Sequence, residues 1–123
     1  MEIPFHGSPA PTVGVEWELG LVDARTFDLV SAADEVFAEL PQDKAQQIHR
    51  ELLLNTVELV TGICNNTTEA MNDLRSSMAA VREVTDDAGI ELFSAGMHPF
   101  ASWEDQHVTR AERYATLIDR TQW

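Results

Sequence analysis

Residues 13–21 read VGVEWELGL, a stretch in which apolar side chains alternate with glycine or glutamate. A period of two is typical of a β-strand with one buried face, because successive side chains point to opposite sides. Glu16 and Glu18 then share the face opposite the apolar one. Two interpretations of this pair are open: charges turned to solvent, or two carboxylates about 6.5–7 Å apart along the strand that suit a hard cation.

Residues 51–60, ELLLNTVELV, form a second apolar run that contains glutamates. We interpret this run as a buried strand, in which a carboxylate needs a partner because an unpaired buried charge is costly. A spacing of seven places Glu51 and Glu58 on opposite faces of a regular strand. Three explanations are open: a bulge redirects one of them, Glu51 lies just before the strand, or only one belongs to a site. Glu58 is the better candidate.

The sequence between these two runs predicts shorter elements. They are a turn at 23–26, a strand at 27–30 that pairs with the first strand at 12–22, a helix over 31–40 and a polar loop over 41–50. Ser31 and Asp34 have the spacing of a capping box, which would begin the helix. Pro41 would end it, because proline cannot continue the hydrogen-bond ladder.

The strongest helical pattern covers residues 67–88. We expect Thr67 or Thr68 to cap this helix and Gly89 to end it. Its apolar stripe is interpreted as core and consists of Met71, Leu74, Met78, Val81 and either Thr85 or Ala88. The elements expected after it are a strand at 90–96, a loop at 96–102 and a polar helix at 103–120. The order of elements predicts an α+β sheet with helices on one side, in a single domain spanning 1–123.

The composition limits the classes of partner. The chain has 21 acidic and 8 basic residues, a net charge of −13, and its arginines are scattered. Binding to nucleic acid or to a membrane surface is therefore not expected. No segment approaches the roughly 18 apolar residues of a membrane span, and the first residues lack the pattern of a signal peptide, so we expect a soluble cytoplasmic protein. The acid excess is typical of a solvated surface and compatible with divalent metals.

Four further residues have chemistry that a site could use. Cys64, the single cysteine, cannot form an intramolecular disulfide and is interpreted as a buried apolar residue. His98 lies in the loop sequence GMHPF, and functional side chains are common in loops; a structural or exposed histidine is the alternative. Arg113 and Tyr114 could contact an anion, and a polar helix face explains them equally well.

Three motifs, in this order and at this spacing, resemble those of a known family. They are PTVGVEWELGLVD at 11–23, ELLLNTVELVTGIC at 51–64 and AGMHPFASW at 95–103. The chain is similar to the amino-terminal part of glutamate–cysteine ligase family 2, the bacterial carboxylate–amine ligases. The Arg-Tyr pair at 113–114 extends the likeness. Met97 stands where the family's G-T-H-P-F segment has threonine, which puts a local hydrogen bond in doubt.

The resemblance implies a glutamine-synthetase-like antiparallel sheet that cups the substrates, which are ATP and amino acids. In the implied reaction the γ-carboxylate of glutamate is phosphorylated by ATP, and an amine such as that of cysteine attacks the acyl phosphate. The implied cofactor is Mg²⁺ or Mn²⁺. Its implied ligands are Glu16 and Glu18 on the first strand, and Glu58 together with Glu51 in the second motif. These hard oxygen ligands suit such ions, which neutralise charge on a transferred phosphoryl group. His98 matches the family's histidine, and we expect His98 and Arg113 to be catalytic.

Members of this family are much longer than 123 residues, so we expect this chain to be the amino-terminal portion of a ligase catalytic domain, inactive alone. An exposed sheet edge would favour pairing with another copy or with the remainder of the enzyme. Two other functions are alternatives: a non-catalytic acidic interaction domain and a divalent-cation-binding module.

Overall fold

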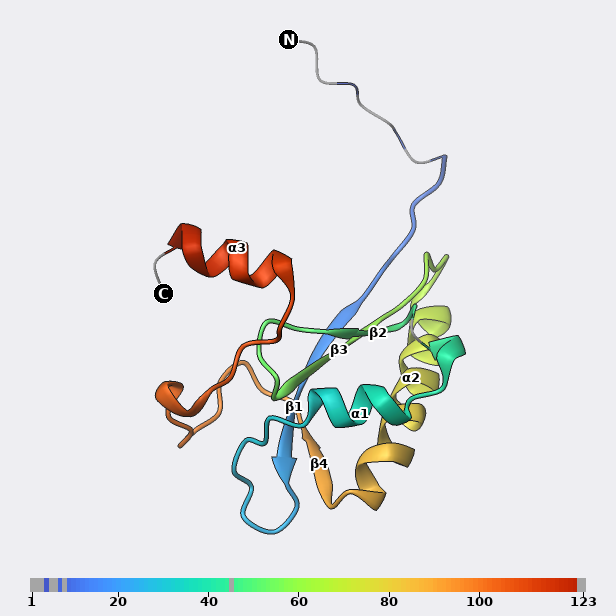
Figure 1. Ribbon diagram of the computed structural model, residues 1–123. Coiled ribbons are helices and arrows are strands. Elements are labelled where there is room, and N and C mark those ends of the chain that lie inside the picture. The colour runs from blue at the N-terminus through green and yellow to red at the C-terminus, as the bar shows by residue number, and fades with distance from the viewer. Residues whose placement is uncertain (1–3, 5–6, 8, 45, 122–123) are drawn as a thin grey trace.

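The computed structural model describes residues 4, 7, 9–44 and 46–121. Its centre is one antiparallel sheet with the strand order β2-β3-β1-β4 (Figure 1). The strands are β1 (Glu16–Asp23), β2 (Ile48–Arg50), β3 (Thr56–Val60) and β4 (Ile90–Phe93). The helices are α1 (Ala33–Glu39), α2 (Thr67–Asp87) and α3 (Glu112–Thr121), with short 3₁₀ helices at η1 (Gln42–Lys44) and η2 (Trp103–Asp105). The α+β class predicted from the sequence is confirmed.

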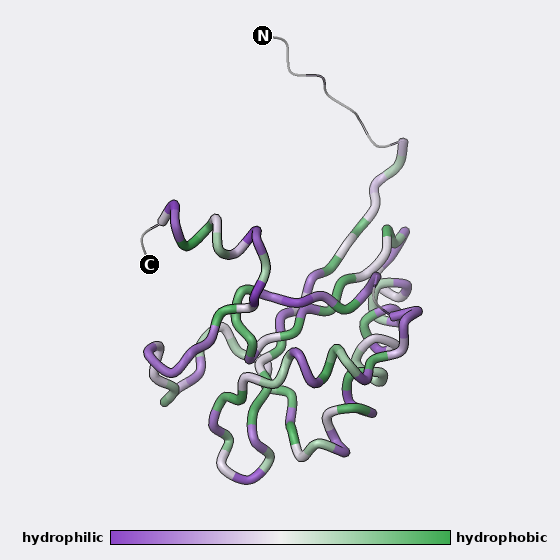
Figure 2. The backbone as a smooth tube through the Cα atoms, in the orientation of Figure 1, coloured by the Kyte–Doolittle hydropathy of each residue, from purple (hydrophilic) through white to green (hydrophobic). Residues whose placement is uncertain are grey.

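The core lies between one face of the sheet and the helices α1 and α2. Alternation places Leu19 and Leu21 of β1 beside Val57 and Leu59 of β3, and all four side chains are fully buried. In Figure 2 both hydrophilic and hydrophobic residues occur along these strands. The helix α3 lies apart from α1 and α2 (Figure 1). No described helix has both the length and the apolar character needed to cross a membrane.

The predicted hairpin at the start of the chain forms only in part. Strand β1 begins at Glu16, and before it Val13 makes a single bridge to Cys64. The turn at 23–26 is confirmed, because the Asp23 carboxylate accepts hydrogen bonds from two backbone amides of that turn. Residues 27–30 contribute one bridge, between Leu29 and Val22, rather than a strand.

The helix expected over 31–40 is present as α1, but its predicted capping box is wrong. The residue at the cap position is Ala32, and no side chain caps the helix. The segment 41–50, expected to be a loop, contains η1 and the edge strand β2. A strand of three residues is too short to show a period of two, which is why the sequence pattern did not indicate it.

The long helix α2 matches its predicted range to within one residue, with two corrections. Asn66 rather than a threonine caps it: its side chain accepts a hydrogen bond from the Glu69 amide at 3.0 Å. Gly89 follows the helix with φ of +68°, a conformation that glycine adopts without strain. The predicted stripe is wrong at Met71, which is half exposed, and of the alternatives Thr85 and Ala88 it is Thr85 that is buried.

The core face of α2 is made mainly of small side chains. Its buried residues are Ala70, Ser77, Ala80, Val81 and Thr85. Leu74 and Met78 of the predicted stripe pack at the edge of the core, partly buried. Small side chains bring the helix close to the sheet, so the larger residues flank the contact.

The last predicted elements are shorter than expected. The strand expected over 90–96 ends at Phe93, and the loop over 96–102 is confirmed. The helix expected over 103–120 is divided into η2 and α3 by residues 106–111. This interruption has a physical cause: the backbone of 107–109 pairs with 52–54 through the bonds Leu54 N–His107 O and Thr109 N–Leu52 O, both 2.8 Å.

Candidate metal centre

Three carboxylates meet on the sheet face opposite the core. Glu18 of β1 lies directly across from Glu58 of β3, and Glu51 approaches from the loop between β2 and β3. One oxygen from each of these three residues lies within 4.8 Å of the other two. We call Glu18, Glu51 and Glu58 the acidic cluster. The period of two in the sequence correctly placed Glu16 and Glu18 on the non-core face of β1.

The spacing of Glu51 and Glu58 is explained by where the strand begins. Strand β3 starts at Thr56, so Glu51 belongs to the loop that precedes it. Of the three explanations left open by the sequence, the second is correct. Within this loop a Glu51 carboxylate oxygen accepts a hydrogen bond from the Leu52 amide at 2.8 Å. A loop residue can therefore share a face with Glu58 although seven positions separate them.

The Glu58 carboxylate is largely buried and lies among like charges. Its side chain is only 14% exposed. Burial raises the pKa of this carboxyl above the usual value for glutamate, and the charges of Glu51 and Glu16 raise it further. Glu18 adds a smaller rise. The opposing influence comes from His49, which lowers the pKa of Glu58.

His49 is a neighbour of the cluster that the sequence analysis missed. It lies on β2 directly across from Glu58, and its Nδ1 atom is 3.6 Å from a Glu58 carboxylate oxygen. The residue lies in the polar run PQDKAQQIHR, where neither the strand nor the register is visible. The sequence contained no signal for this pair, because the contact depends on a strand that its own residues do not indicate.

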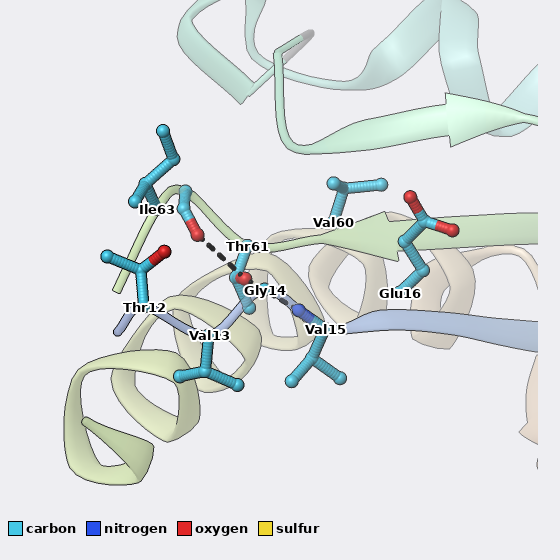
Figure 3. A pocket seen from close by; sticks show the side chains of 9 residues that line it. Thr12, Val13, Gly14, Val15, Glu16, Val60, Thr61 and Ile63 are labelled. Atoms are coloured by element: carbon cyan, nitrogen blue, oxygen red, sulfur yellow. Dashed lines mark hydrogen bonds between the residues drawn. The ribbon is translucent and has the colours of Figure 1, made fainter. Parts of the chain in front are cut away.

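Glu16 lies on the same face but outside the cluster. It pairs with Val60 at the far end of β1 and β3, on the rim of a hollow with a volume of about 470 Å³ between residues 12–16 and 60–63 (Figure 3). The Thr61 hydroxyl in this hollow is already used: it accepts from Val15 N and donates to the Gly62 carbonyl, both at 2.9 Å. Among the described residues that line the hollow, Glu16 is the one with a charged side chain.

His98 lies further along the same face of the sheet. Its Nε2 atom is 2.9 Å from the Phe27 carbonyl, while Nδ1 accepts from the Ala101 amide at 3.1 Å. The Nδ1 atom is thus the acceptor, and Nε2–H donates. The ring also packs against Phe93 of β4, the residue directly opposite Gly20 of β1. These contacts join two loops, and the structure does not place His98 in the acidic cluster.

Arg113 and Tyr114 lie at the start of α3, against the loop that carries Glu51. The Arg113 Nη2 atom donates to the Arg50 carbonyl at 2.9 Å, and the Tyr114 hydroxyl donates to the same oxygen at 3.0 Å. Burial raises the pKa of Tyr114 above its usual value, and the charge of Glu51 raises it further. The hydroxyl therefore keeps its proton and stays a donor.

Cys64 is buried, as expected. Burial is the main cause that raises the pKa of its thiol, and the charge of Asp73 contributes to the rise. A thiol that holds its proton is a weak nucleophile. Cys64 is therefore a packing residue at the bridge to Val13.

The acidic cluster fits a hard divalent cation by its chemistry. Opposite oxygen ligands around Mg²⁺ are about 4.2 Å apart, since each bond is about 2.1 Å long, and the cluster oxygens span a similar distance, up to 4.8 Å. The nearest basic group that the structure pairs with the cluster is His49, which carries a positive charge only when protonated. Three carboxylates with so little neutralising charge favour a cation among them.

Comparisons with known proteins identify the family of this chain. The chain matches the family described as glutamate-cysteine ligase family 2 over residues 12–123. It is 58% identical over 121 residues to "Putative glutamate--cysteine ligase 2-1" of Mycobacterium sp. (strain KMS), and 54% identical to "Putative glutamate--cysteine ligase 2" of Mycobacterium tuberculosis (strain ATCC 25177 / H37Ra). Each match covers 98% of this chain and 32% of the relative, so the chain spans about a third of the length of these curated relatives. This chain belongs to glutamate–cysteine ligase family 2.

Proposed function

We propose that this chain supplies part of the Mg²⁺ or Mn²⁺ site of an ATP-dependent carboxylate–amine ligase. The observation that carries the proposal is the acidic cluster, in which residues from β1, β3 and the preceding loop bring three carboxylates to one place. All three lie within the segment that matches the family. The relatives that this chain matches carry the name glutamate–cysteine ligase.

The proposed roles follow from the positions of the side chains. Glu18, Glu51 and Glu58 would bind the cation, which when bound supplies positive charge to the ATP phosphates. Glu16 faces the same side and is near enough for its charge to raise the pKa of Glu58. It would bind a second ion or water in the ion's shell. The core beneath the sheet holds these groups in place, because β1 and β3 present fully buried leucines on their other face.

In the proposed reaction ATP phosphorylates the γ-carboxylate of glutamate with release of ADP, and an amine such as that of cysteine then displaces phosphate from the acyl phosphate to form the amide. The residues that contact the nucleotide and complete the site would come from the two thirds of the relatives' length that this chain does not cover, and without them the chain would be inactive. His98 and Arg113 stay predictions as catalytic residues.

A chimaera tests the proposed function in a chain of full length. Residues 12–121 would replace the matching segment of the Mycobacterium sp. relative, with which the chain is 58% identical. We expect the chimaera to release ADP only when Mg²⁺, glutamate and an amine substrate are all present. We expect Glu58→Gln in the chimaera to abolish this release, and Glu83→Gln, which changes an exposed helical residue, to preserve it. ADP release unaffected by Glu58→Gln would contradict the proposal.

A divalent-cation-binding module without catalysis is the second candidate, because the same acidic cluster supports it. The two functions differ in their use of ATP. A ligase site binds Mn²⁺ more tightly with ATP present in the chimaera, because phosphate oxygens complete the shell of the ion. A simple cation module would show the same Mn²⁺ affinity with and without ATP.

The partners expected from the sequence are retained as proposals. Apart from ATP and amino acids, these include a second copy of the chain, or the remainder of the enzyme, at a sheet edge. The outer strand β4 pairs only with β1 among the described residues, so its free edge is where such a partner would add. Sedimentation that shows a stable monomer across micromolar concentrations would exclude self-association.

A further inference from the structure

The loop that carries Glu51 is held from outside by the start of α3 and the segment before it. Unlike Glu18 and Glu58, Glu51 has no strand to fix its backbone. Its position depends on bonds made by residues more than fifty positions later in the chain. This dependence raises a question about α3: whether the helix only covers the protein surface or also sets the geometry of the acidic cluster.

Three side chains bind the two carbonyl groups next to the Glu51 side chain. The Thr109 hydroxyl donates to the Glu51 carbonyl itself at 2.5 Å. Arg113 and Tyr114 both donate to the carbonyl of Arg50, the preceding residue. We call Thr109, Arg113 and Tyr114 the carbonyl clamp. With both flanking peptide groups held, the backbone at Glu51 has little freedom to rotate.

Two of the three clamp residues are buried, whereas Arg113 is exposed. Thr109 is 5% exposed and Tyr114 is 7% exposed, and Tyr114 is the buried residue that the structure gives for α3. Hydrogen bonds at such positions matter because a buried polar group left without a partner is costly. The helix thus meets the rest of the protein at the Glu51 loop through a side chain whose polar end binds that loop.

The loop in turn sets the carboxylate. The Leu52 amide donates to the Glu51 side chain at 2.8 Å, and the Leu52 carbonyl accepts from Thr109 N at 2.8 Å. The backbone on both sides of the carboxylate is thereby fixed to the same segment. A ligand carboxylate whose backbone and side chain are both hydrogen-bonded is preorganised for a metal.

We propose that Thr109 and Tyr114 are positioning residues for the metal site, which hold Glu51 in the acidic cluster by clamping the carbonyl groups of Arg50 and Glu51. The inference deepens the proposed function and rests on it. The alternative is that these side chains only attach α3 to the protein. The two roles differ in what happens at Glu51 when the hydroxyls are removed.

The test is the double variant Thr109→Val/Tyr114→Phe, which removes the two hydroxyls and keeps the shapes of the side chains. Thr116→Val is the matched control, because it removes an exposed hydroxyl from the same helix. The first measurement is amide hydrogen exchange at Leu52, whose N–H reports the position of the Glu51 carboxylate. We expect exchange about fivefold faster in the double variant, the change that loss of one ordinary hydrogen bond produces.

The second measurement is Mn²⁺ affinity, for which we expect a roughly tenfold loss in the double variant, as for other groups that orient metal ligands. Unchanged exchange of the amides of Val57 and Leu59 would show that the sheet is intact. The control should match the unmodified chain in both measurements. Tyr114→Phe alone is a milder variant, and a smaller change in the same direction is expected.

Two results would overturn the inference. One is an unchanged Leu52 exchange rate in the double variant, which would reduce the clamp to an attachment for α3. The other is an equal change in Thr116→Val, which would indicate a general effect on the helix. If the unmodified chain binds no Mn²⁺, the proposed function fails for this chain, whereas Leu52 exchange still decides whether the clamp positions Glu51.

Discussion

The two faces of β1 and β3 are made by alternate residues of the same strands and have opposite properties. On one face Leu19 and Leu59 are fully buried against α1 and α2. On the other, Glu18 and Glu58 lie directly opposite each other, with Glu51 beside them. The first face stabilises the fold, because it removes apolar surface from water. The second opposes folding, because it brings like charges together.

The proposed metal site would account for this difference between the two faces. A protein selected only for stability would place opposite charges or polar residues across from each other on the open face. Here burial and three neighbouring carboxylates raise the pKa of Glu58, so the ionised form of this group is disfavoured in the folded chain. A bound divalent cation would place positive charge among these carboxylates and would favour their ionised forms.

The largest expected change in stability comes from a substitution on the core face. Leu59→Ala should lower the free energy of unfolding by about 3 kcal/mol, because it removes a fully buried side chain and leaves a cavity. Val60→Ala, at the neighbouring position on the other face, should cost less than about 1 kcal/mol. Urea denaturation of both variants measures the difference. Equal losses would show that the two faces are not distinct.

The second largest change in stability is expected when a divalent cation binds to the acidic face. Mn²⁺ at 100 times its dissociation constant should raise the free energy of unfolding by about 2.7 kcal/mol, because it binds only the folded chain. The same increment should be found in Leu59→Ala, whose change lies on the opposite face. Thermal denaturation with and without Mn²⁺ measures it. Destabilisation by Mn²⁺ would contradict cation binding on this face.

The third effect is the release of charge repulsion in metal-free buffer. Glu58→Gln should stabilise the chain by about 1 kcal/mol at pH 7, since like charges opposite one another are destabilising. The folded-state pKa of Glu58 is raised, so the stability that this group contributes is fully present below its unfolded pKa. It is lost as the pH rises through the folded pKa. The advantage of the variant should therefore disappear in acid, which urea denaturation at several pH values would show.

The smallest effect is expected at Glu16. This residue lies across from Val60 rather than from another acid, although its charge still raises the pKa of Glu58. Glu16→Gln should stabilise the metal-free chain by roughly 0.3 kcal/mol at pH 7. A gain as large as that of Glu58→Gln would place Glu16 inside the cluster rather than beside it.

The sequence predicted the features that depend on local residue patterns. The period of two located β1 and assigned its faces, and helical spacing located α2 to within a residue. The cap was predicted at Thr67 or Thr68 and lies at Asn66, because asparagine and threonine are both good capping residues. The stripe was wrong at Met71 because α2 packs against the sheet through small side chains, which hydrophobicity alone does not indicate.

What the sequence could not predict depends on contacts between distant residues. The position of Glu51 follows from bonds to Thr109 and Tyr114, far along the chain, and His49 reaches Glu58 through a strand of three residues. The family resemblance identified the glutamates, and only the fold shows which three of them meet. The roles predicted for His98 and Arg113 stay predictions, since both side chains are engaged with backbone carbonyls.

Titration calorimetry with Mn²⁺ tests the central claim, that the acidic face binds a divalent cation. The chain would be compared with Glu18→Gln/Glu58→Gln and with Glu35→Gln/Glu83→Gln, a control that makes the same change of charge at exposed helical positions. The account predicts binding by the unmodified chain and by the control, and none by the first variant. Binding that survives Glu18→Gln/Glu58→Gln, or no binding by the unmodified chain, would contradict it.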